Sequence, residues 1–568
     1  MKVENARRLT GRGFYLPGPG AAVELWWEPS DDRARLELAW QTDVLTPLLA
    51  AMGAATAIRY VHLRETGLTC GLLAPIDRLL AVADALEWGA LWLAGASETT
   101  FSEAFAAFKS ALVEQANPPL LALEAAAKAR GVPFLWDEVA VSLGLGVHAE
   151  VFPLRGLPAV NDVAWARYRA VPVGLVTGTN GKTTTTRMTA QILGAAGHTA
   201  GLSSTDAIAI GGVVVEAGDW TGPGATRRVL RDPRVTAAVL ETARGGILRR
   251  GLAYELADAA IVTNIGADHF GEYGINSLEE MARVKAVVWD GVRPGGKRIA
   301  NAGCPVSLQH LAAVRRDAIG GHDWVLFGRQ PGPELARHAA AGGETWTIDG
   351  DAVVHRLAGR TTRVIGVDAI PATFGGTAVH NVENALAAAA LAFALGVDHA
   401  AVARGLAAFG RSPRDNPGRL EVYEVAGRRV ILDFAHNPHG VHALAPVIAS
   451  LRKAQESRLM VVTGQAGDRI DHDMVELARA ILDMDPDRVA VRPIRGYERG
   501  RALGEVEAIM QAALIDMGLG AERFAIVDDE IDALDKGIAW AEPGDIVLVL
   551  AHIQRVEVQA WLAARTIT

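Results

Sequence analysis

The sequence predicts an α/β protein of three domains, with a nucleotide-binding sheet at its centre. Three observations predict this class. The chain has 568 residues, about half of them apolar, and domains average roughly 150 residues. After residue 172, short apolar runs alternate with helical patterns, as expected of mostly parallel sheets covered by helices. One such run, 173–177, leads directly into a glycine-rich turn of the kind that binds phosphate.

Composition narrows the class of protein. A formal charge of −9 gives no bulk attraction to nucleic acid. Two cysteines, Cys70 and Cys304, are too few for a disulfide framework or a metal cluster, and they suit a reducing compartment. Residues 1–15 lack the order of a secretory leader. The most apolar run, 385–397, is shorter than the roughly 18 to 20 residues that cross a bilayer. We expect a cytoplasmic protein with neither nucleic-acid nor membrane partners, and the sequence leaves a homo-oligomer open.

Residues 1–165 are predicted to form a separate α+β domain. This segment is rich in Trp, Ala and Leu, contains no phosphate-type loop, and runs into a stretch dotted with prolines at 152–172. Its role is left open among tethering a polymer, forming a dimer and covering an apolar surface. Its tryptophans are predicted to be packing residues because their neighbours are apolar.

Residues 166–413 are predicted to form the central ATP-binding domain, a mostly parallel sheet with flanking helices. A turn with two prolines and several charges follows at 411–419 and places the next boundary near Pro413. The strand-like runs lie at 236–240, 259–263 and 298–301, and the helical patterns lie at 186–196 and 278–289.

Residues 414–568 are predicted to form a C-terminal Rossmann-like α/β domain. Short apolar runs again alternate with helical patterns, which predicts a second sheet covered by helices. The strand-like runs lie at 420–425, 429–434, 458–463, 488–491 and 545–550.

The turn after residue 177 has the chemistry of a polyphosphate cradle. Glycines allow backbone N–H groups to close on phosphate oxygens, and the following helix N-terminus adds partial positive charge. Lys182 can reach the terminal phosphates, and a Thr183 or Thr184 hydroxyl can hold Mg²⁺. The usual loop would have a glycine where this chain has Val176, so the loop is a variant. The predicted ATP contacts are Gly178, Thr179, Asn180, Gly181, Lys182, Thr183 and Thr184.

Several further segments stand in the order shown by one family. From about 171 to 562 the chain resembles the Mur ligases, ATP-dependent amide ligases of peptidoglycan, folylpolyglutamate and cyanophycin synthesis. Within that family it is most similar to the Mur-type half of cyanophycin synthetases, but without their ATP-grasp domain. The segments are SSTDAI at 203–208, GDWTGPGATR at 218–227, LETARGGILRRGL at 240–252, TNIGADH at 263–269 and RGRALGEV at 499–506.

The resemblance implies a metal and catalytic cluster around Lys182. Glu241 ends an apolar run, where open sheets bind ligands and where a carboxylate can hold Mg²⁺. Taken without the neighbouring motifs, such a glutamate is more often a solvated residue at a strand end. His269 is implied to bind a second Mg²⁺. Lys285 matches a family lysine that is often carbamylated, which would make it an anionic ligand, although an ordinary solvated helix lysine is the alternative. The predicted catalytic residues are Lys182, Glu241, His269 and Lys285, and the predicted metal ligands are Thr183, Glu241, His269 and carbamylated Lys285.

Further nucleotide contacts are implied by three later segments. Asn264 follows a predicted strand, HNVENALAA begins at 380, and an arginine suited to phosphates by its forked, permanent charge follows the boundary turn. The signature D-F-A-H-N-P at 433–438 has phenylalanine where the family has tyrosine. The implied contacts are Asn264, His380, Asn381, Asn384, Arg419 and Asp433.

Substrate contacts are implied by the same resemblance. The turn at 464–469 matches a family turn near the incoming amino acid, although a plain glycine-rich loop would explain it nearly as well. The implied residues are Ser204, Thr205, Asp206, Arg244, His436, Asn437, Asp468, Arg469, Arg499, Arg501 and Glu505.

Together these segments imply an ADP-forming carboxylate–amine ligase that uses ATP and Mg²⁺. It would activate a carboxylate of a peptide or amino acid as an acyl phosphate and couple it to an amino-acid amine, with arginine or lysine as the first choice. Without the ATP-grasp half it would not run two-step polymerisation alone, and it would act on a ready-made peptide or beside a separate ATP-grasp ligase. Two alternatives are a nucleotide-binding subunit that scaffolds or regulates such a ligase, and a folylpolyglutamate-type ligase.

Overall fold

The computed structural model describes residues 1–28, 31–53, 59–64, 66–268, 270–314 and 321–566. Two compact units make up the chain. The first comprises Met1–Thr347, Val354–Thr362 and Leu386–Gly405, and the second comprises Ile348–Val353, Arg363–Ala385 and Leu406–Thr568. This division does not test the boundaries predicted near 165 and 413, which stay predictions. Among the described residues, no helix has the length and apolar character needed to span a membrane.

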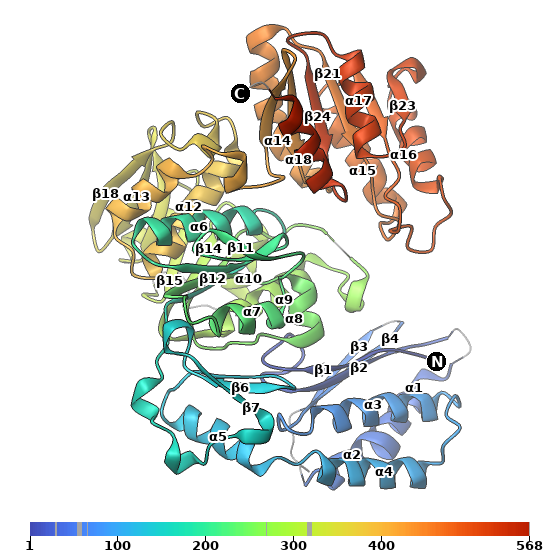
Figure 1. Cartoon of the computed structure of the whole chain (residues 1–568). Coiled ribbons are helices and arrows are strands. Elements are labelled where there is room, and N and C mark those ends of the chain that lie inside the picture. Colours follow the sequence, from blue (N-terminus) through green and yellow to red (C-terminus); the bar gives the residue numbers. More distant parts are fainter. Residues whose placement is uncertain (29–30, 54–58, 65, 269, 315–320, 567–568) are drawn as a thin grey trace. The chain divides into compact units, whose positions relative to one another are not determined.

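The chain begins with an antiparallel sheet of order β1-β2-β4-β3, and helix α3 lies along one of its faces (Figure 1). A second, three-stranded sheet of order β5-β6-β7 follows. The helices of this N-terminal part of the chain are α1 (Arg33–Ala39), α2 (Thr46–Ala51), α3 (Leu79–Leu93), α4 (Phe101–Glu114) and α5 (Pro118–Ala129). The strands of the two sheets are β1 (Lys2–Leu9), β2 (Gly20–Trp26), β3 (Arg59–Arg64), β4 (Gly67–Leu73), β5 (Phe134–Trp136), β6 (Ala140–Leu143) and β7 (Glu150–Pro153).

Alternation along β2 gives the N-terminal sheet two buried faces. Ala21, Val23 and Leu25 pack into the core beneath α3. On the opposite face, Ala22 joins Leu9 of β1 in the core of the central domain. Because successive strand residues point to opposite faces, the N-terminal sheet is packed on both sides and shares its second core with the residues that follow.

The central sheet has the order β11-β10-β9-β12-β8-β13-β14-β15-β16-β17-β18. Strands β9, β12, β8, β13, β14, β15 and β16 pair in parallel, and β10 and β11 form an antiparallel hairpin at one edge. Its strands are β8 (Val173–Thr177), β9 (Ala200–Ser203), β10 (Ala207–Ile210), β11 (Val213–Ala217), β12 (Ala237–Glu241), β13 (Ala257–Val262), β14 (Val292–Asn301), β15 (Trp324–Gly328), β16 (Glu344–Asp349), β17 (Ala352–Leu357) and β18 (Arg360–Gly366). Its helices are α6 (Lys182–Ala195), α7 (Pro223–Leu230), α8 (Arg244–Arg250), α9 (Leu278–Asp290), α10 (Pro305–Val314), α11 (Pro333–Ala340), α12 (Val379–Ala394) and α13 (His399–Ala408).

Helix α6 starts at Lys182, four residues before the predicted start at 186. Gly181 caps it with φ of 80°, a left-handed conformation that glycine adopts without strain. The four threonines after Lys182 hid the start of the helix, because β-branched residues lower helix propensity. Burial of all four against the sheet overrides that propensity.

The C-terminal sheet has the order β19-β20-β24-β21-β22-β23, with β19 antiparallel at one edge. Alternate residues of its strands enter two separate cores, one with α14, α15 and α16 and one with α17 and α18. Its strands are β19 (Glu421–Val425), β20 (Arg428–Asp433), β21 (Leu459–Thr463), β22 (Arg488–Val491), β23 (Phe524–Ile526) and β24 (Ile546–Leu550). Its helices are α14 (Pro438–Gln455), α15 (Asp471–Leu482), α16 (Glu505–Asp516), α17 (Glu530–Trp540) and α18 (Arg555–Arg565). The predicted α/β class is confirmed.

Candidate active site

The glycine-rich turn joins the end of β8 to the start of α6. A Cβ atom on Gly178 would lie 1.9 Å from Thr263 Oγ1, so the backbone passes too close to β13 for any side chain. The Lys182 ammonium group folds back and donates to Thr179 O at 2.9 Å. Three structural features that phosphate requires thus coincide here, namely a helix N-terminus, a side-chain-free turn and a lysine.

The end of β13 fixes the shape of this turn. Asn264 accepts a hydrogen bond from Asn180 N at 2.9 Å through Oδ1 and donates to Asn180 O at 3.1 Å through Nδ2. Thr263 Oγ1 donates to the same carbonyl at 2.7 Å. Asn264 therefore holds the turn through both ends of its amide, and its predicted contact with nucleotide stays a prediction.

Glu241 ends β12 and collects hydroxyl groups from two other segments. Thr183 Oγ1, in the first turn of α6, donates to Glu241 Oε2 at 2.9 Å. Thr205 Oγ1 donates to the other carboxylate oxygen at 2.8 Å. The side chain is 1% exposed, which excludes the interpretation as a solvated strand-end residue. A buried carboxylate with two hydroxyls is a set of hard oxygen donors of the kind that Mg²⁺ prefers.

Lys285 lies on α9 and points at the same turn. It is 4% exposed, and its ammonium donates to Gly178 O at 2.8 Å. Burial, with the nearby charge of Lys182 as a second cause, holds the pKa of Lys285 well below its usual range. The ordinary solvated helix lysine is therefore excluded, and carbamylation stays a prediction.

Three of the other residues predicted in the first unit have clear partners in the structure, and a fourth lies outside the described residues. Arg244 is buried at the start of α8 and pairs with Glu272, and burial lowers the pKa of its guanidinium group. Asp206 lies 3.4 Å from the guanidinium of Arg187 on α6. Ser204 Oγ donates to Ala207 O at 3.2 Å and shapes a turn. His269 lies outside the described residues, so its predicted metal role stays a prediction.

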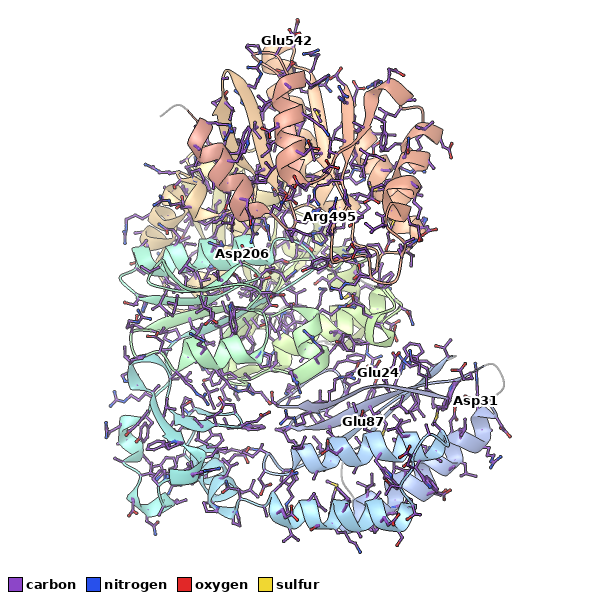
Figure 2. The ribbon with its side chains drawn as sticks, turned by 45° about the vertical axis from the view of Figure 1, so that its right-hand side comes forward. Glu24, Asp31, Glu87, Asp206, Arg495 and Glu542 are labelled. Carbon is purple, nitrogen blue, oxygen red and sulfur yellow. The ribbon has the colours of Figure 1, made fainter. Side chains whose placement is uncertain are left out.

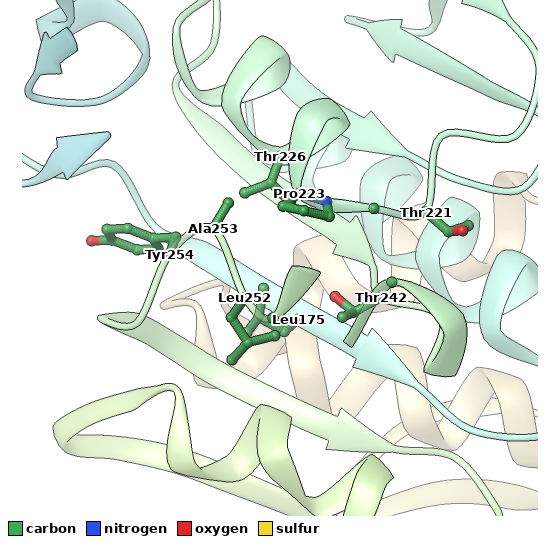
Figure 3. A pocket seen from close by; sticks show the side chains of 11 residues that line it. Leu175, Thr221, Pro223, Thr226, Thr242, Leu252, Ala253 and Tyr254 are labelled. Atoms are coloured by element: carbon green, nitrogen blue, oxygen red, sulfur yellow. The ribbon is translucent and has the colours of Figure 1, made fainter. Parts of the chain in front are cut away.

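A small cavity lies near this site, between the start of α7 and the end of α8 (Figure 3). Its volume is about 10 Å³, room for one water molecule. The lining includes Thr221, Thr242 and Tyr254, and none of residues 178–184 belongs to it. It is too small for a substrate, and we give it no functional role.

In the second unit, Asp433 and the turn after it are held by backbone contacts. Asp433 Oδ2 accepts from Leu420 N at 2.7 Å, and Oδ1 accepts from Ala435 N at 2.7 Å. Burial raises the pKa of Asp433. The guanidinium of Arg419 lies 4.3 Å from the centre of the Phe434 ring. Asn437 caps α14 by accepting from Gly440 N at 2.8 Å, so its amide oxygen serves the fold.

The RGRALGEV segment is anchored by one of its arginines. Arg501 donates to Gly467 O at 2.9 Å and to Arg469 O at 2.8 Å, and it pairs with Asp471 and Glu505 at 2.6 and 2.7 Å. This places Arg501 and Glu505 in the support of the loop before α15. Arg499 and Asp468 are exposed, and their predicted substrate contacts stay predictions.

The HNVENALAA segment forms the first turns of α12. His380 Nδ1 donates to Ala443 O of α14 at 2.9 Å, since a carbonyl can only accept. Burial lowers the pKa of His380 to about 4. Asn381 Nδ2 donates to Ala372 O at 2.8 Å, and Asn384 Nδ2 donates to Asn381 Oδ1 at 3.1 Å. The nucleotide contacts predicted for these three residues stay predictions.

Two family models match the chain in the order of this architecture. The Mur ligase middle domain matches residues 176–392, and the Mur ligase glutamate ligase domain matches residues 418–553. The chain belongs to the Mur ligase family. Members of the Mur ligase family use ATP, which agrees with the turn before α6.

Among curated Mur-type relatives, the chain is similar to cyanophycin synthetase of Synechocystis sp., with 35% identity over 72% of this chain and 46% of the relative. It is also similar to a UDP-N-acetylmuramoyl-L-alanyl-D-glutamate–2,6-diaminopimelate ligase of Corynebacterium efficiens, with 29% identity over 66% of this chain and 68% of the relative. The chain spans about half the length of the cyanophycin synthetases that it matches. A folylpolyglutamate synthase/dihydrofolate synthase solved with Mn, AMPPNP and L-glutamate shares the fold, with TM-score 0.50 and 21% identity over 69% of this chain and 89% of that one.

One buried network of this Mur ligase was missed by the sequence predictions. Arg492 and Glu530 are each 1% exposed and form an ion pair beneath the turn that carries His436. His552 connects this pair to the turn, because its ring lies 3.2 Å from Arg492 Nη2 and 3.2 Å from Ala435 O. Arg492 stood in the sequence with Arg495, Arg499 and Arg501 as a basic cluster, and nothing in the pattern marked it as buried.

Proposed function

We propose that this chain is an ATP-dependent, ADP-forming carboxylate–amine ligase. One observation carries the proposal: Thr183, Thr205 and Glu241 form a hydrogen-bonded oxygen cluster next to the phosphate-type turn, and Lys285 is buried against that turn. Phosphoryl transfer needs such a combination of positioned oxygens and cations.

The residues fit a magnesium ion and a nucleotide. Thr183 and Glu241, with Lys285 if it is carbamylated, would hold the ion, and His269 joins them by the family resemblance. A bound Mg²⁺ neutralises charge on the transferred phosphoryl group. Residues 178–184 would bind the phosphates through backbone N–H groups, and Lys182 would contact the terminal phosphate.

The proposed reaction has two steps. A substrate carboxylate oxygen attacks the γ-phosphorus of ATP, which forms an acyl phosphate and releases ADP. An amine then attacks the acyl carbon, the carbon–oxygen bond to phosphate breaks, and the amine loses a proton as the amide forms. In the first step Lys182 stabilises the charge on the phosphoryl oxygens, and no side chain of the protein has to become a covalent intermediate.

For the substrates we propose a carboxyl-bearing peptide and an amino-acid amine, with arginine or lysine first. The likeness to the Mur-type part of cyanophycin synthetase supports this choice. Arg244, buried beside the site, is the group we assign to a substrate carboxylate. The peptide would be made elsewhere, by a separate ATP-grasp ligase in our proposal.

The test is ADP release by the purified chain with Mg-ATP, across a panel of amino acids and short aspartate-containing peptides. We expect release that requires both a carboxyl peptide and one amine. Lys182→Ala should lower the rate by about 10²- to 10³-fold, as loss of a phosphate-stabilising group does in other enzymes. Lys128→Ala removes an exposed lysine and serves as the matched control. ATP binding without release for any pair would favour the scaffold alternative.

A further inference from the structure

The Arg244–Glu272 ion pair joins two separate segments at the site. Arg244 begins α8, and Glu272 lies in the loop 271–275 between β13 and α9. Neither segment contains the other partner, so the pair depends on how the two are held together. A positioned Arg244 is what the proposed function requires of a carboxylate-binding group.

The loop 271–275 has a backbone that needs outside support. Tyr273 has φ of 54° and ψ of 26°, a left-handed conformation that is uncommon for a bulky residue. Gly271 and Gly274 on either side also have positive φ, at 94° and 69°. A non-glycine residue such as Tyr273 is strained in this conformation, which persists where neighbours fix it.

Besides Arg244, three residues of the N-terminal segment touch this loop, namely Arg7, Tyr15 and Arg64. Tyr15 OH lies 3.5 Å from Tyr273 O, and the Arg7 guanidinium lies 5.1 Å from the centre of the Tyr273 ring. A Cβ atom on Gly274 would lie 1.5 Å from Arg64 Nη1, so this guanidinium packs directly on the loop backbone.

Arg7 contacts both segments at once. It is 8% exposed on β1 and donates to Leu248 O of α8 at 3.1 Å through Nε, while its charge pairs with Glu24 at 2.8 Å. Glu24 is fully buried on β2, and Figure 2 shows it on the N-terminal sheet, with Glu87 on the helix at the other face. The alternation that sends Leu9 into the central core sends Arg7 to the same face.

Arg64 packs on the same loop at Gly274. Its guanidinium lies 4.5 Å from the centre of the Trp26 ring. In the part of the chain that the structure describes, its three side-chain nitrogens are buried and make no hydrogen bond. Burying a guanidinium without hydrogen bonds lowers the free energy of unfolding. The position of Arg64 between a tryptophan and the Gly274 backbone therefore indicates a role other than stabilising the fold.

We propose that the N-terminal domain is a positioning element of the active site. Arg7 joins α8 to the loop 271–275, Arg64 packs on the backbone of that loop, and the two arginines so fix the Arg244–Glu272 pair. This assigns a role to residues 1–165, and only its catalytic consequence rests on the proposed ligase function.

The test compares hydrogen exchange of the loop in the full chain and its variants. R64M removes one of these arginines, and the double variant R7M/E24Q removes the other without leaving a buried lone carboxylate. R8M is the matched control, because Arg8 is the next residue of β1 and pairs with the exposed Glu138 at 2.5 Å. We expect exchange in the peptide that covers 271–275 to rise by about tenfold or more in both variants and to stay unchanged in R8M.

Exchange in residues 178–184 should remain as in the parent chain. Loop exchange equal to that of R8M in the folded variants would overturn the proposal, and so would a rise spread evenly over the whole chain. If R7M/E24Q does not fold, the loop exchange of R64M alone tests the proposal. With an active ligase, the KM for the carboxyl substrate should rise by about tenfold while the KM for ATP holds. Absence of ADP release in the parent chain would count against the ligase alone, because the exchange readout needs no activity.

Discussion

Replacing Glu530 by alanine should destabilise the C-terminal domain more than other single changes to its acidic residues. Glu530 is the acceptor of a buried network at the start of α17. Its carboxylate accepts from the backbone N–H groups of His552, Ile553 and Gln554, at 2.6, 3.2 and 2.7 Å, and it pairs with Arg492. The substitution would leave the Arg492 guanidinium buried without its counter-ion and the three N–H groups without their acceptor.

The expected cost follows from the burial of both partners. Breaking a buried ion pair by removing one side costs about 3–5 kcal/mol. For a domain of this size each kcal/mol lowers Tm by roughly 2–4 °C, so the unfolding midpoint should fall by about 6–20 °C. The double change R492M/E530M should cost less than E530A, because it removes the charge that would otherwise remain buried.

Glu542→Ala is the matched control, since Glu542 is exposed and pairs with Arg458 at 3.5 Å (Figure 2). An exposed pair of this kind contributes about 0–1 kcal/mol. The assay is urea unfolding, monitored through hydrogen exchange of the backbone amides of β24, whose five residues are fully buried. If E530A unfolds within about 1 kcal/mol of E542A, the network does not stabilise the domain and the reasoning fails.

Two further predictions concern Lys285 and His380. K285A should lower ADP release by about 10²- to 10³-fold, and added short carboxylic acids should restore part of the rate if the lysine is carbamylated; no recovery would count against carbamylation. His380 has a pKa lowered from 6.5 to about 4 by burial, so the unfolded chain binds a proton that the folded chain does not between these values. Stability should therefore fall as pH drops from 6.5 to 4, by at most about 3 kcal/mol because part of the side chain reaches solvent. In H380N, urea midpoints across this range should lose that dependence, and an unchanged slope would contradict the assignment.

The sequence predicted the strand, turn and helix of the candidate phosphate site because these three elements are local. A strand, a turn of fixed glycine spacing and a helix follow one another without interruption, so the pattern contains the geometry. The position of Glu241 was predicted in the same way, since a carboxylate that ends a buried strand must lie at the edge of the sheet.

The sequence could not predict which side chains are buried or which distant residues they contact. Whether Lys285 was solvated or buried depends on the packing of α9 against β8, which pairs residues more than a hundred positions apart. The left-handed turn at Tyr273 has no local signature, because tyrosine does not favour positive φ. The support of that turn by residues of β1 and β3 becomes visible only in the fold.

The turn that carries His436 is likewise recognisable from its local motif, whereas its conformation depends on contacts with distant residues. Arginine can only donate hydrogen bonds, so Arg492 at 3.2 Å requires an unprotonated Nδ1 on His552, and Nε2 then carries the proton that is donated to Ala435 O. Burial, with the charge of Arg492 as a second cause, holds the pKa of His552 well below its usual range, which favours the neutral ring that this tautomer requires. Gln465 donates to the next carbonyl of the turn, His436 O, at 2.8 Å. The motif D-F-A-H-N-P supplies the groups that we assign to substrate, but its conformation is set by the residue after β22, by α17 and by the segment after β24. A search for motifs finds such a turn, and only the packing of distant residues explains why it keeps its shape.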